Sequence, residues 1–142
     1  MLGVNRYFKL EEFLTSSTAK QKSIENLPSF EVVEHIKELS EFLDGLREEW
    51  GSGINVTSGF RNSALNKAVG GVDNSVHKTG YAADLQPANG KMEEFKKFIV
   101  AWLKDKNFDE AIIEKNKKTT WIHIQLYSPN GFQRKKIFSL SV

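Results

Sequence analysis

The sequence contains no cysteine, only three prolines and no apolar run long enough to span a membrane. Without cysteine, disulfide bonds, thiolate metal sites and cysteine nucleophiles are excluded, so any metal must be held by histidine, aspartate, glutamate or the backbone. The N-terminus also lacks the basic stretch followed by an apolar one that is typical of a secretory signal peptide. We therefore expect neither a transmembrane segment nor a cleaved leader.

A charge of one sign is also missing, because 20 lysines and arginines stand against 18 aspartates and glutamates. A chain with a formal net charge of +2 and no basic block is not expected to bind nucleic acid. Basic residues do gather in the second half of the chain. We expect these to lie on solvated faces: Lys104, Lys106, Lys115, Lys117, Lys118, Arg134, Lys135 and Lys136.

The 142 residues contain no internal repeat and no Pro/Gly/Ser-rich linker, so we predict a single domain over residues 1–142. Apolar residues at helical spacing predict two long helices, one between a capping Ser29 and a terminating Gly51, the other over Lys91–Lys106. A short helix is expected near residues 62–71. Apolar and β-branched segments predict strands at Ile54–Phe60, Tyr81–Gln86, Ala111–Glu114, Thr120–Tyr127 and Ile137–Val142. The predicted fold is α+β, with a small, mainly antiparallel sheet packed with two long helices.

The three histidines lie in different settings. His35 is one residue off the apolar stripe of the first long helix, and we expect a partly exposed residue without a role. His123 alternates with aliphatic residues along a strand, so it faces a cleft or solvent if the aliphatic face is the core. His77 lies in a Gly/Asn/Ser-rich loop seven residues before Asp84, an aspartate in an apolar strand that needs a partner if it is buried.

Two imidazoles and one carboxylate are a complete ligand set for catalytic zinc, which keeps a fourth position for water and lowers the pKa of that water to about 7. For His77 and Asp84 to meet, the chain between them must turn back, because seven extended residues would separate them by roughly 23 Å. Gly80 can provide this turn. On spacing alone, an ordinary loop histidine and a capped or salt-bridged aspartate are the commoner explanation.

The residues around these positions resemble a known family. A pattern Ser-x-His-x-x-Gly-x-Ala-x-Asp is followed by a Trp-x-His strand, at Ser75, His77, Gly80, Ala82, Asp84, Trp121 and His123. Together with Ser-Gly-Phe-Arg at residues 58–61, these motifs closely resemble the zinc D-Ala-D-Ala carboxypeptidase family of murein peptidases, peptidase family M15. The resemblance covers nearly the whole chain and is to the phage-related branch. It implies the fold shared with the hedgehog signalling domain, and zinc bound by His77, Asp84 and His123.

The resemblance also implies residues that contact substrate. Arg61 matches a family arginine of the substrate cleft, where its planar fork could grip a terminal carboxylate or polarise the scissile carbonyl; the alternative is a surface ion pair. Ser75 matches the family serine and could hydrogen-bond substrate or cap its own loop. Trp121, on the His123 face of its strand, could wall the cleft or stack on substrate, although packing is the commoner role of such a residue.

The general base is less clear from the sequence. Many family members carry an acidic residue three positions before the last histidine ligand, but this chain has Thr120 there, which cannot take a proton. The phage-related branch has a glutamate at the end of the preceding strand, which matches Glu114. An even-numbered turn such as Lys117-Lys118 would place Glu114 opposite Trp121 on the His123 face, whereas an odd-numbered loop would turn it away.

The resemblance therefore implies a zinc metallopeptidase that acts on peptidoglycan stem peptides, as a D-Ala-D-Ala carboxypeptidase or a murein endopeptidase of the endolysin type. We expect a monomer that accumulates in the cytoplasm and is released to the cell wall as phage lysins are. The alternative is a zinc-stabilised binding module without hydrolytic activity. It stays open because Thr120 cannot act as a general base and the position of Glu114 depends on the length of the turn.

Overall fold

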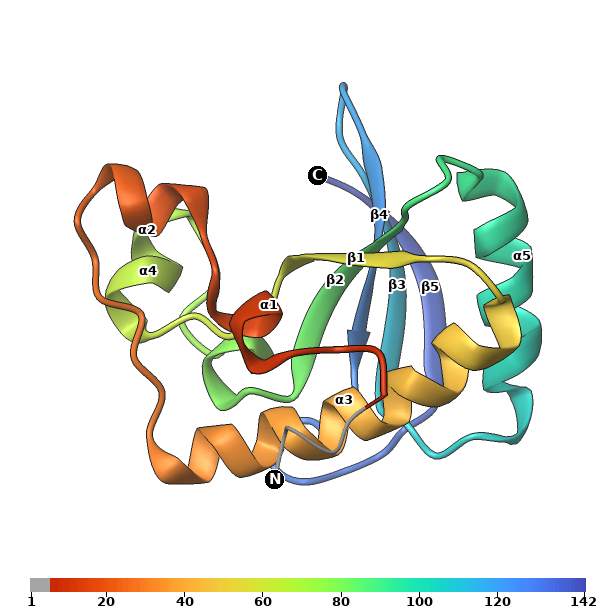
Figure 1. Cartoon of the computed structure of the whole chain (residues 1–142), viewed down its shortest axis with the longest axis horizontal. Coiled ribbons are helices and arrows are strands. Elements are labelled where there is room, and N and C mark those ends of the chain that lie inside the picture. The colour runs from red at the N-terminus through yellow and green to blue at the C-terminus, as the bar shows by residue number, and fades with distance from the viewer. Residues whose placement is uncertain (1–5) are drawn as a thin grey trace.

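A computed structural model of the protein describes residues 6–142, so residues 1–5 of the predicted domain lie outside the described part. The strands form one five-stranded sheet, and helices lie around it (Figure 1). The α-helices are α1 (Leu10–Leu14), α2 (Ser17–Gln21), α3 (Phe30–Trp50), α4 (Ser63–Ala68) and α5 (Met92–Trp102), with 3-10 helices η2 (Val76–Thr79) and η3 (Leu103–Asp105). The strands are β1 (Ile54–Ser58), β2 (Ala82–Pro87), β3 (Glu110–Lys115), β4 (Thr120–Gln125) and β5 (Lys136–Ser141).

The sheet has the strand order β1-β2-β4-β3-β5. Neighbouring strands are antiparallel except for β3 and β5, which run parallel. The prediction of an α+β fold with a mainly antiparallel sheet and two longer helices is confirmed. The predicted strands are all present, with ends that differ by one or two residues.

The hydrophobic core lies between one face of the sheet and the two long helices. Figure 1 shows α5 on one side of the sheet and α2 and α4 on the other. Alternate residues of β2, β3 and β4 point toward α3 and α5, as expected for strands with one buried face. The best buried core residues include Ile36, Leu39, Leu43, Leu46, Leu85, Phe95, Ile99, Ile122 and Ile124.

The long helices begin and end largely where their residues predict. The Ser29 hydroxyl accepts a hydrogen bond from the backbone N–H of Val32, and Gly51 ends α3 in the left-handed conformation at φ 76°. The second helix is shorter than predicted, since it tightens into 3-10 geometry at Leu103, as helix C-termini often do. Among residues 6–142, no helix combines the length and apolar composition that crossing a membrane requires.

Candidate metal centre

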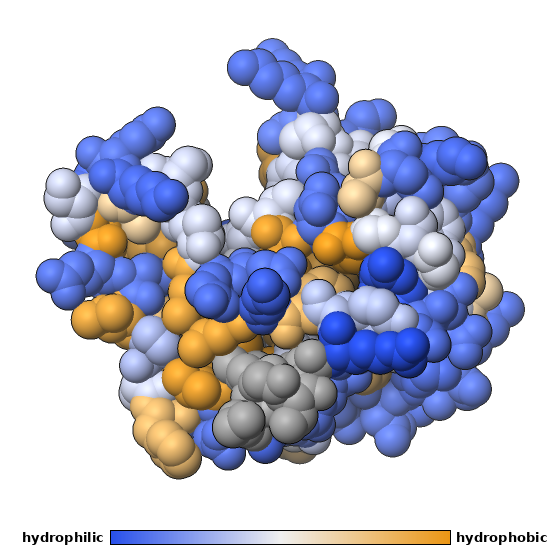
Figure 2. Space-filling model, viewed as in Figure 1, coloured by the Kyte–Doolittle hydropathy of each residue, from blue (hydrophilic) through white to orange (hydrophobic). Residues whose placement is uncertain are grey.

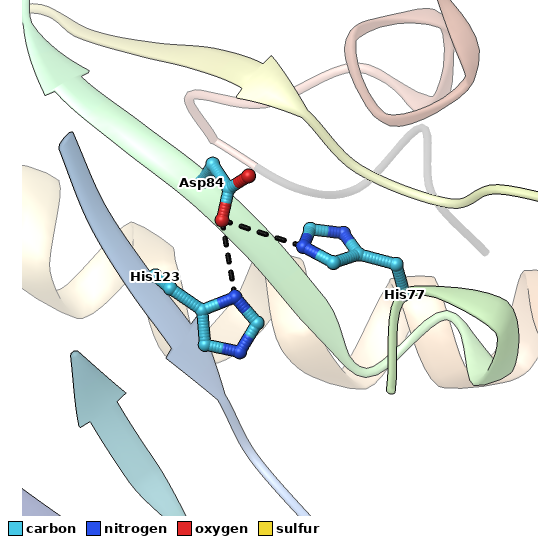
Figure 3. Close-up of side chains that lie close together, drawn as sticks. All are labelled: His77, Asp84 and His123. Carbon is cyan, nitrogen blue, oxygen red and sulfur yellow. Dashed lines mark hydrogen bonds and ion pairs between the residues drawn. The ribbon is translucent and has the colours of Figure 1, made fainter. Parts of the chain in front are cut away.

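Two of the three candidate ligands lie on the sheet face that points away from the core. Asp84 of β2 and His123 of β4 are paired directly across the antiparallel strands. The helix η2 brings His77 to the same point (Figure 3). Oδ1 of Asp84 lies 3.3 Å from Nε2 of His77 and 3.1 Å from Nδ1 of His123. The sheet register and η2 together thus bring His123 to a His77–Asp84 pair from which it is 39 or more residues away in the sequence.

The turn between His77 and Asp84 depends on Gly80. Its φ of +87° is in the left-handed region, and a Cβ atom there would lie 2.9 Å from the carbonyl oxygen of Val32 in α3. At the other end of η2, the Ser75 hydroxyl accepts a hydrogen bond of 3.2 Å from the backbone N–H of His77. Ser75 therefore caps its own loop, and it also lines the cleft described below.

A backbone carbonyl sets the orientation of the His77 ring. Nδ1 of His77 lies 2.7 Å from the carbonyl oxygen of Gly59. A carbonyl only accepts hydrogen bonds, so Nδ1 carries a hydrogen, and Nε2 is the ring nitrogen that faces Asp84 and is left for a metal. Gly59 can approach this closely because it lacks a side chain: a Cβ atom would lie 2.5 Å from the carbonyl oxygen of Phe13.

The three side chains fit the requirements of a metal site. All are buried, and one nitrogen or oxygen of each lies within 4.8 Å of the others. Burial alone would raise the pKa of the Asp84 carboxyl, but the neighbouring imidazoles of His77 and His123 hold it well below its ordinary value. Burial would lower the pKa of His123, and the hydrogen bond and charge of Asp84 reverse this and raise it. Two imidazoles and an ionised carboxylate are the donors of known three-residue zinc sites, so this group could bind a metal.

A cleft of about 530 Å³ opens over this group. Figure 2 shows the surface hollowed between the part that covers α2 and α4 and the hydrophilic tip of the β3–β4 hairpin. The segment of residues 70–76 lines one side of the cleft, while Glu114 and Trp121 line the other. Leu140 and Val142 contribute from the end of the chain. The three candidate ligands thus lie in the lining of this cleft.

Glu114 lies on the face of the sheet that carries His123. The hairpin turn has Lys117 and Lys118 at its centre, and Glu114 is paired with Trp121 as the even-numbered turn predicts. The indole N–H of Trp121 donates to Oε1 of Glu114 at 3.1 Å, and this oxygen lies 4.0 Å from Nδ1 of His123. A carboxylate therefore stands beside the candidate ligands. Thr120 does not line the cleft.

Arg61 is an inner residue of the cleft and is not part of a surface ion pair. Its guanidinium donates to the hydroxyl of Ser58 and to the amide oxygen of Asn66, each at 3.2 Å. A third nitrogen, Nη2, lies 3.7 Å from Oδ2 of Asp84, the oxygen that faces away from the histidines. Burial lowers the pKa of Arg61, and Asp84 and Glu114 oppose this shift. Arg61 thus holds Asp84 in addition to facing the cleft.

Three further residues contact this site and were not found in the sequence. Gln125 lies two residues after His123, on the same face of the strand, and accepts a hydrogen bond from the His123 ring. The alternation of side chains along a strand could have predicted that Gln125 lies beside His123. Asp109 is fully buried behind Gln125. Arg134 is exposed, as predicted, but its guanidinium also pairs with Asp109 and Glu110. No local pattern indicates that pairing.

The remaining histidine is outside the cleft. His35 is partly exposed, as predicted, and its Nδ1 donates to the carbonyl oxygen of Thr79 while its ring stacks on Tyr81 with centroids 4.1 Å apart. These contacts give His35 a packing role beneath η2.

Comparison with known proteins agrees with this geometry. No curated protein gives a significant match to the chain. Residues 6–125 match the family described as Peptidase M15, and this segment includes all three candidate ligands, Glu114 and Arg61. The matched segment makes up most of the sequence and carries the buried His-Asp-His group. The chain therefore belongs to the Peptidase M15 family.

Proposed function

We propose that the protein is a zinc-dependent peptidase that hydrolyses stem peptides of peptidoglycan, as a D-Ala-D-Ala carboxypeptidase or a murein endopeptidase. Family membership supplies the peptidase class. The observation that carries the proposal is the position of the Glu114 carboxylate beside the buried His77–Asp84–His123 group, in a cleft open to solvent. The motifs shared with murein peptidases supply the substrate class.

His77, Asp84 and His123 would hold the zinc ion. The nitrogen and oxygen atoms that face one another are Nε2 of His77, Oδ1 of Asp84 and Nδ1 of His123. Zinc bound there would polarise the scissile carbonyl and make water a stronger nucleophile at neutral pH. Arg61 supports this ligand set by holding the second oxygen of Asp84.

Glu114 would act as the general base and then as the general acid. It accepts a proton from the attacking water while the water oxygen bonds to the carbonyl carbon, and it returns that proton to the leaving amine as the C–N bond breaks. Trp121 supports this role because its indole N–H holds Oε1 of Glu114. The ring of Trp121 also forms a wall of the cleft against which substrate can pack.

Arg61 and Ser75 would orient the substrate. Arg61 has donors on a planar fork that match a peptide carboxylate or carbonyl. Ser75 lies at the lip of the cleft beside His77, with a hydroxyl that can also donate a hydrogen bond. We further propose a monomeric lysin of the phage type, which accumulates in the cytoplasm and reaches the cell wall on release.

The decisive experiment is mass spectrometry of defined muropeptides incubated with the zinc-loaded protein. A chelator-treated sample, a Glu114→Gln variant and an exposed control, Glu93→Gln on α5, are run alongside. We expect chelator-sensitive loss of a terminal D-Ala, or cleavage of a stem or cross-link, by the parent and the control. Removal of a general base typically lowers the rate by about 10²–10⁴-fold, so Glu114→Gln should bind zinc normally and lose turnover.

Muropeptides left intact by a zinc-loaded, folded parent protein would contradict the proposed activity. That result would favour the alternative of a zinc-stabilised binding module. Full turnover by Glu114→Gln would instead keep the peptidase and remove Glu114 from the role of general base.

A further inference from the structure

A row of buried polar contacts leads away from the far side of the His123 ring. Nε2 of His123 lies 2.7 Å from Oε1 of Gln125, and Nε2 of Gln125 donates to Oδ2 of Asp109, also at 2.7 Å. Nε and Nη2 of Arg134 then donate to the two oxygens of Asp109 at 2.8 Å. Gln125 is 5% exposed and Asp109 is 0% exposed, so the contacts next to His123 are shielded from water, whereas the Arg134 side chain at the end of the row is 40% exposed.

The hydrogen bonds from Arg134 favour the ionised form of Asp109, which can only accept hydrogen bonds. The carboxylate receives the two guanidinium bonds and a third from the backbone N–H of Arg134 at 3.1 Å. Burial alone would raise the pKa of Asp109, but the hydrogen bonds from Arg134 and Gln125 lower it below its ordinary value. An ionised carboxylate has no hydrogen to donate, so every group that faces Asp109 must donate to it.

This requirement fixes the side-chain amide of Gln125 and, through it, the imidazole of His123. The NH₂ group of Gln125 must face Asp109, so its carbonyl oxygen must face His123. The ring nitrogen opposite that carbonyl must donate, which places a hydrogen on Nε2 of His123. When a metal takes the place of the Nδ1 hydrogen that can bond to Asp84, Nδ1 then supplies the lone pair, and Nδ1 is the ring nitrogen that lies 3.1 Å from Oδ1 of Asp84.

We propose that Arg134, Asp109 and Gln125 form a positioning relay that holds His123 in the tautomer and orientation that bind the metal through Nδ1. The proposal rests on the metal site of the proposed function but not on which bond the protein cuts. None of the three is a catalytic residue in this scheme, since each acts through His123. Arg134 lies outside the residues 6–125 that match the family, so the last part of the chain contributes to the order of the metal centre.

Zinc affinity, measured by competition with a chromogenic chelator, tests the relay without any assay of turnover. Gln125→Met keeps the length of the side chain and removes both hydrogen bonds, while Asp109→Asn removes the charge that orients the amide. We expect each to weaken zinc binding by about 10–100-fold, the usual effect of removing the partner of a histidine ligand. The matched control is Gln86→Met, a half-buried residue near the end of β2, where the amide contacts Thr119 and Thr120.

A spectroscopic readout covers the case in which a variant fails to fold. In the zinc-loaded parent protein with ¹⁵N-labelled histidine, His123 should carry its proton on Nε2, in slow exchange with water, and His77 should carry its proton on Nδ1. Gln125→Met should speed that exchange at His123 and leave His77 unchanged. A parent proton on Nδ1 of His123, or parent-like zinc affinity in a folded Gln125→Met, would overturn the relay. Normal zinc binding without muropeptide cleavage would instead leave the relay intact and contradict the proposed peptidase.

Discussion

At the scale of single residues, each candidate ligand is held by a partner on the side away from the other two. The carbonyl of Gly59 holds His77, Gln125 holds His123, and Arg61 lies beside the outer oxygen of Asp84. Such contacts restrict rings and carboxylates that would otherwise rotate, so less freedom is lost when a metal binds. The candidate site is therefore oriented by the fold itself.

Asp109 should make a pH-dependent contribution to stability. Its pKa in the folded protein is lowered from an ordinary value of 3.8, so the ionised carboxylate stabilises the fold above that pH. The contribution is lost as the pH falls through the lowered pKa. We expect Asp109→Asn to cost about 1–3 kcal/mol at pH 7, the range for hydrogen bonds to buried charged groups, and clearly less at pH 2.

Urea unfolding of both proteins at pH 7 and pH 2 measures this difference. Asp105→Asn serves as the control, because Asp105 is exposed and its ion pair is with the neighbouring, partly exposed Lys106. The same loss of stability at both pH values would argue against an ionised Asp109 as the source.

At the scale of elements, the sequence predicts best what a single segment determines. The apolar stripe of α3 and its caps follow from periodicity and are found. For Glu114 the sequence left two turn lengths open, and the structure has the even-numbered turn that pairs Glu114 with Trp121. The helices α1 and α2 were not predicted, because five residues are too few to show a helical period. The ion pair of Arg134 was not predicted, because its partner Asp109 is brought near it by the parallel pairing of β5 with β3.

Gly80 should be one of the most sensitive positions in the turn that delivers His77. Gly80→Ala combines an unfavourable left-handed conformation with a Cβ atom 2.9 Å from the carbonyl oxygen of Val32. We expect a loss of about 2–3 kcal/mol in unfolding free energy and weaker zinc binding. Gly51→Ala is the matched control, since Gly51 has a similar φ of +76° but nothing within 4 Å of a Cβ atom, and it should cost only about 1 kcal/mol.

Chemical denaturation measures the stability of the two variants, and chelator competition measures their zinc affinity. Comparing the two variants separates the cost of the left-handed backbone, which both share, from the cost of the contact with Val32, which only Gly80→Ala has. Equal losses in Gly80→Ala and Gly51→Ala would mean that the approach of α3 to Gly80 is unimportant.

At the scale of the whole molecule, the candidate metal centre connects parts of the chain that the core alone does not join. The helix η2 reaches the sheet on the face opposite α3 and α5, where His77 meets β2 and β4. A metal at this point would link that segment to the centre of the sheet. Because an unfolded chain lacks the assembled site, binding free energy would add to folding free energy.

Zinc should therefore raise the melting temperature. At a free zinc concentration one hundred times the dissociation constant, the expected gain is about 2.7 kcal/mol, or roughly 10 °C for a chain of this size. Calorimetry with and without zinc measures the shift. His35→Gln should keep the response because His35 lies outside the cleft, whereas His123→Ala should abolish it; a retained shift in His123→Ala would place the zinc elsewhere.

The contact between Asp109 and Arg134 also bears on how cooperatively the cleft opens. Arg134 precedes β5, and it supplies three hydrogen bonds to a carboxylate that is buried behind Gln125 and the histidine strand. If the segment of Arg134 came away from the sheet, Asp109 would stay buried without its guanidinium, which is costly. This segment should therefore not fray independently, and its release should loosen Gln125 and the cleft together.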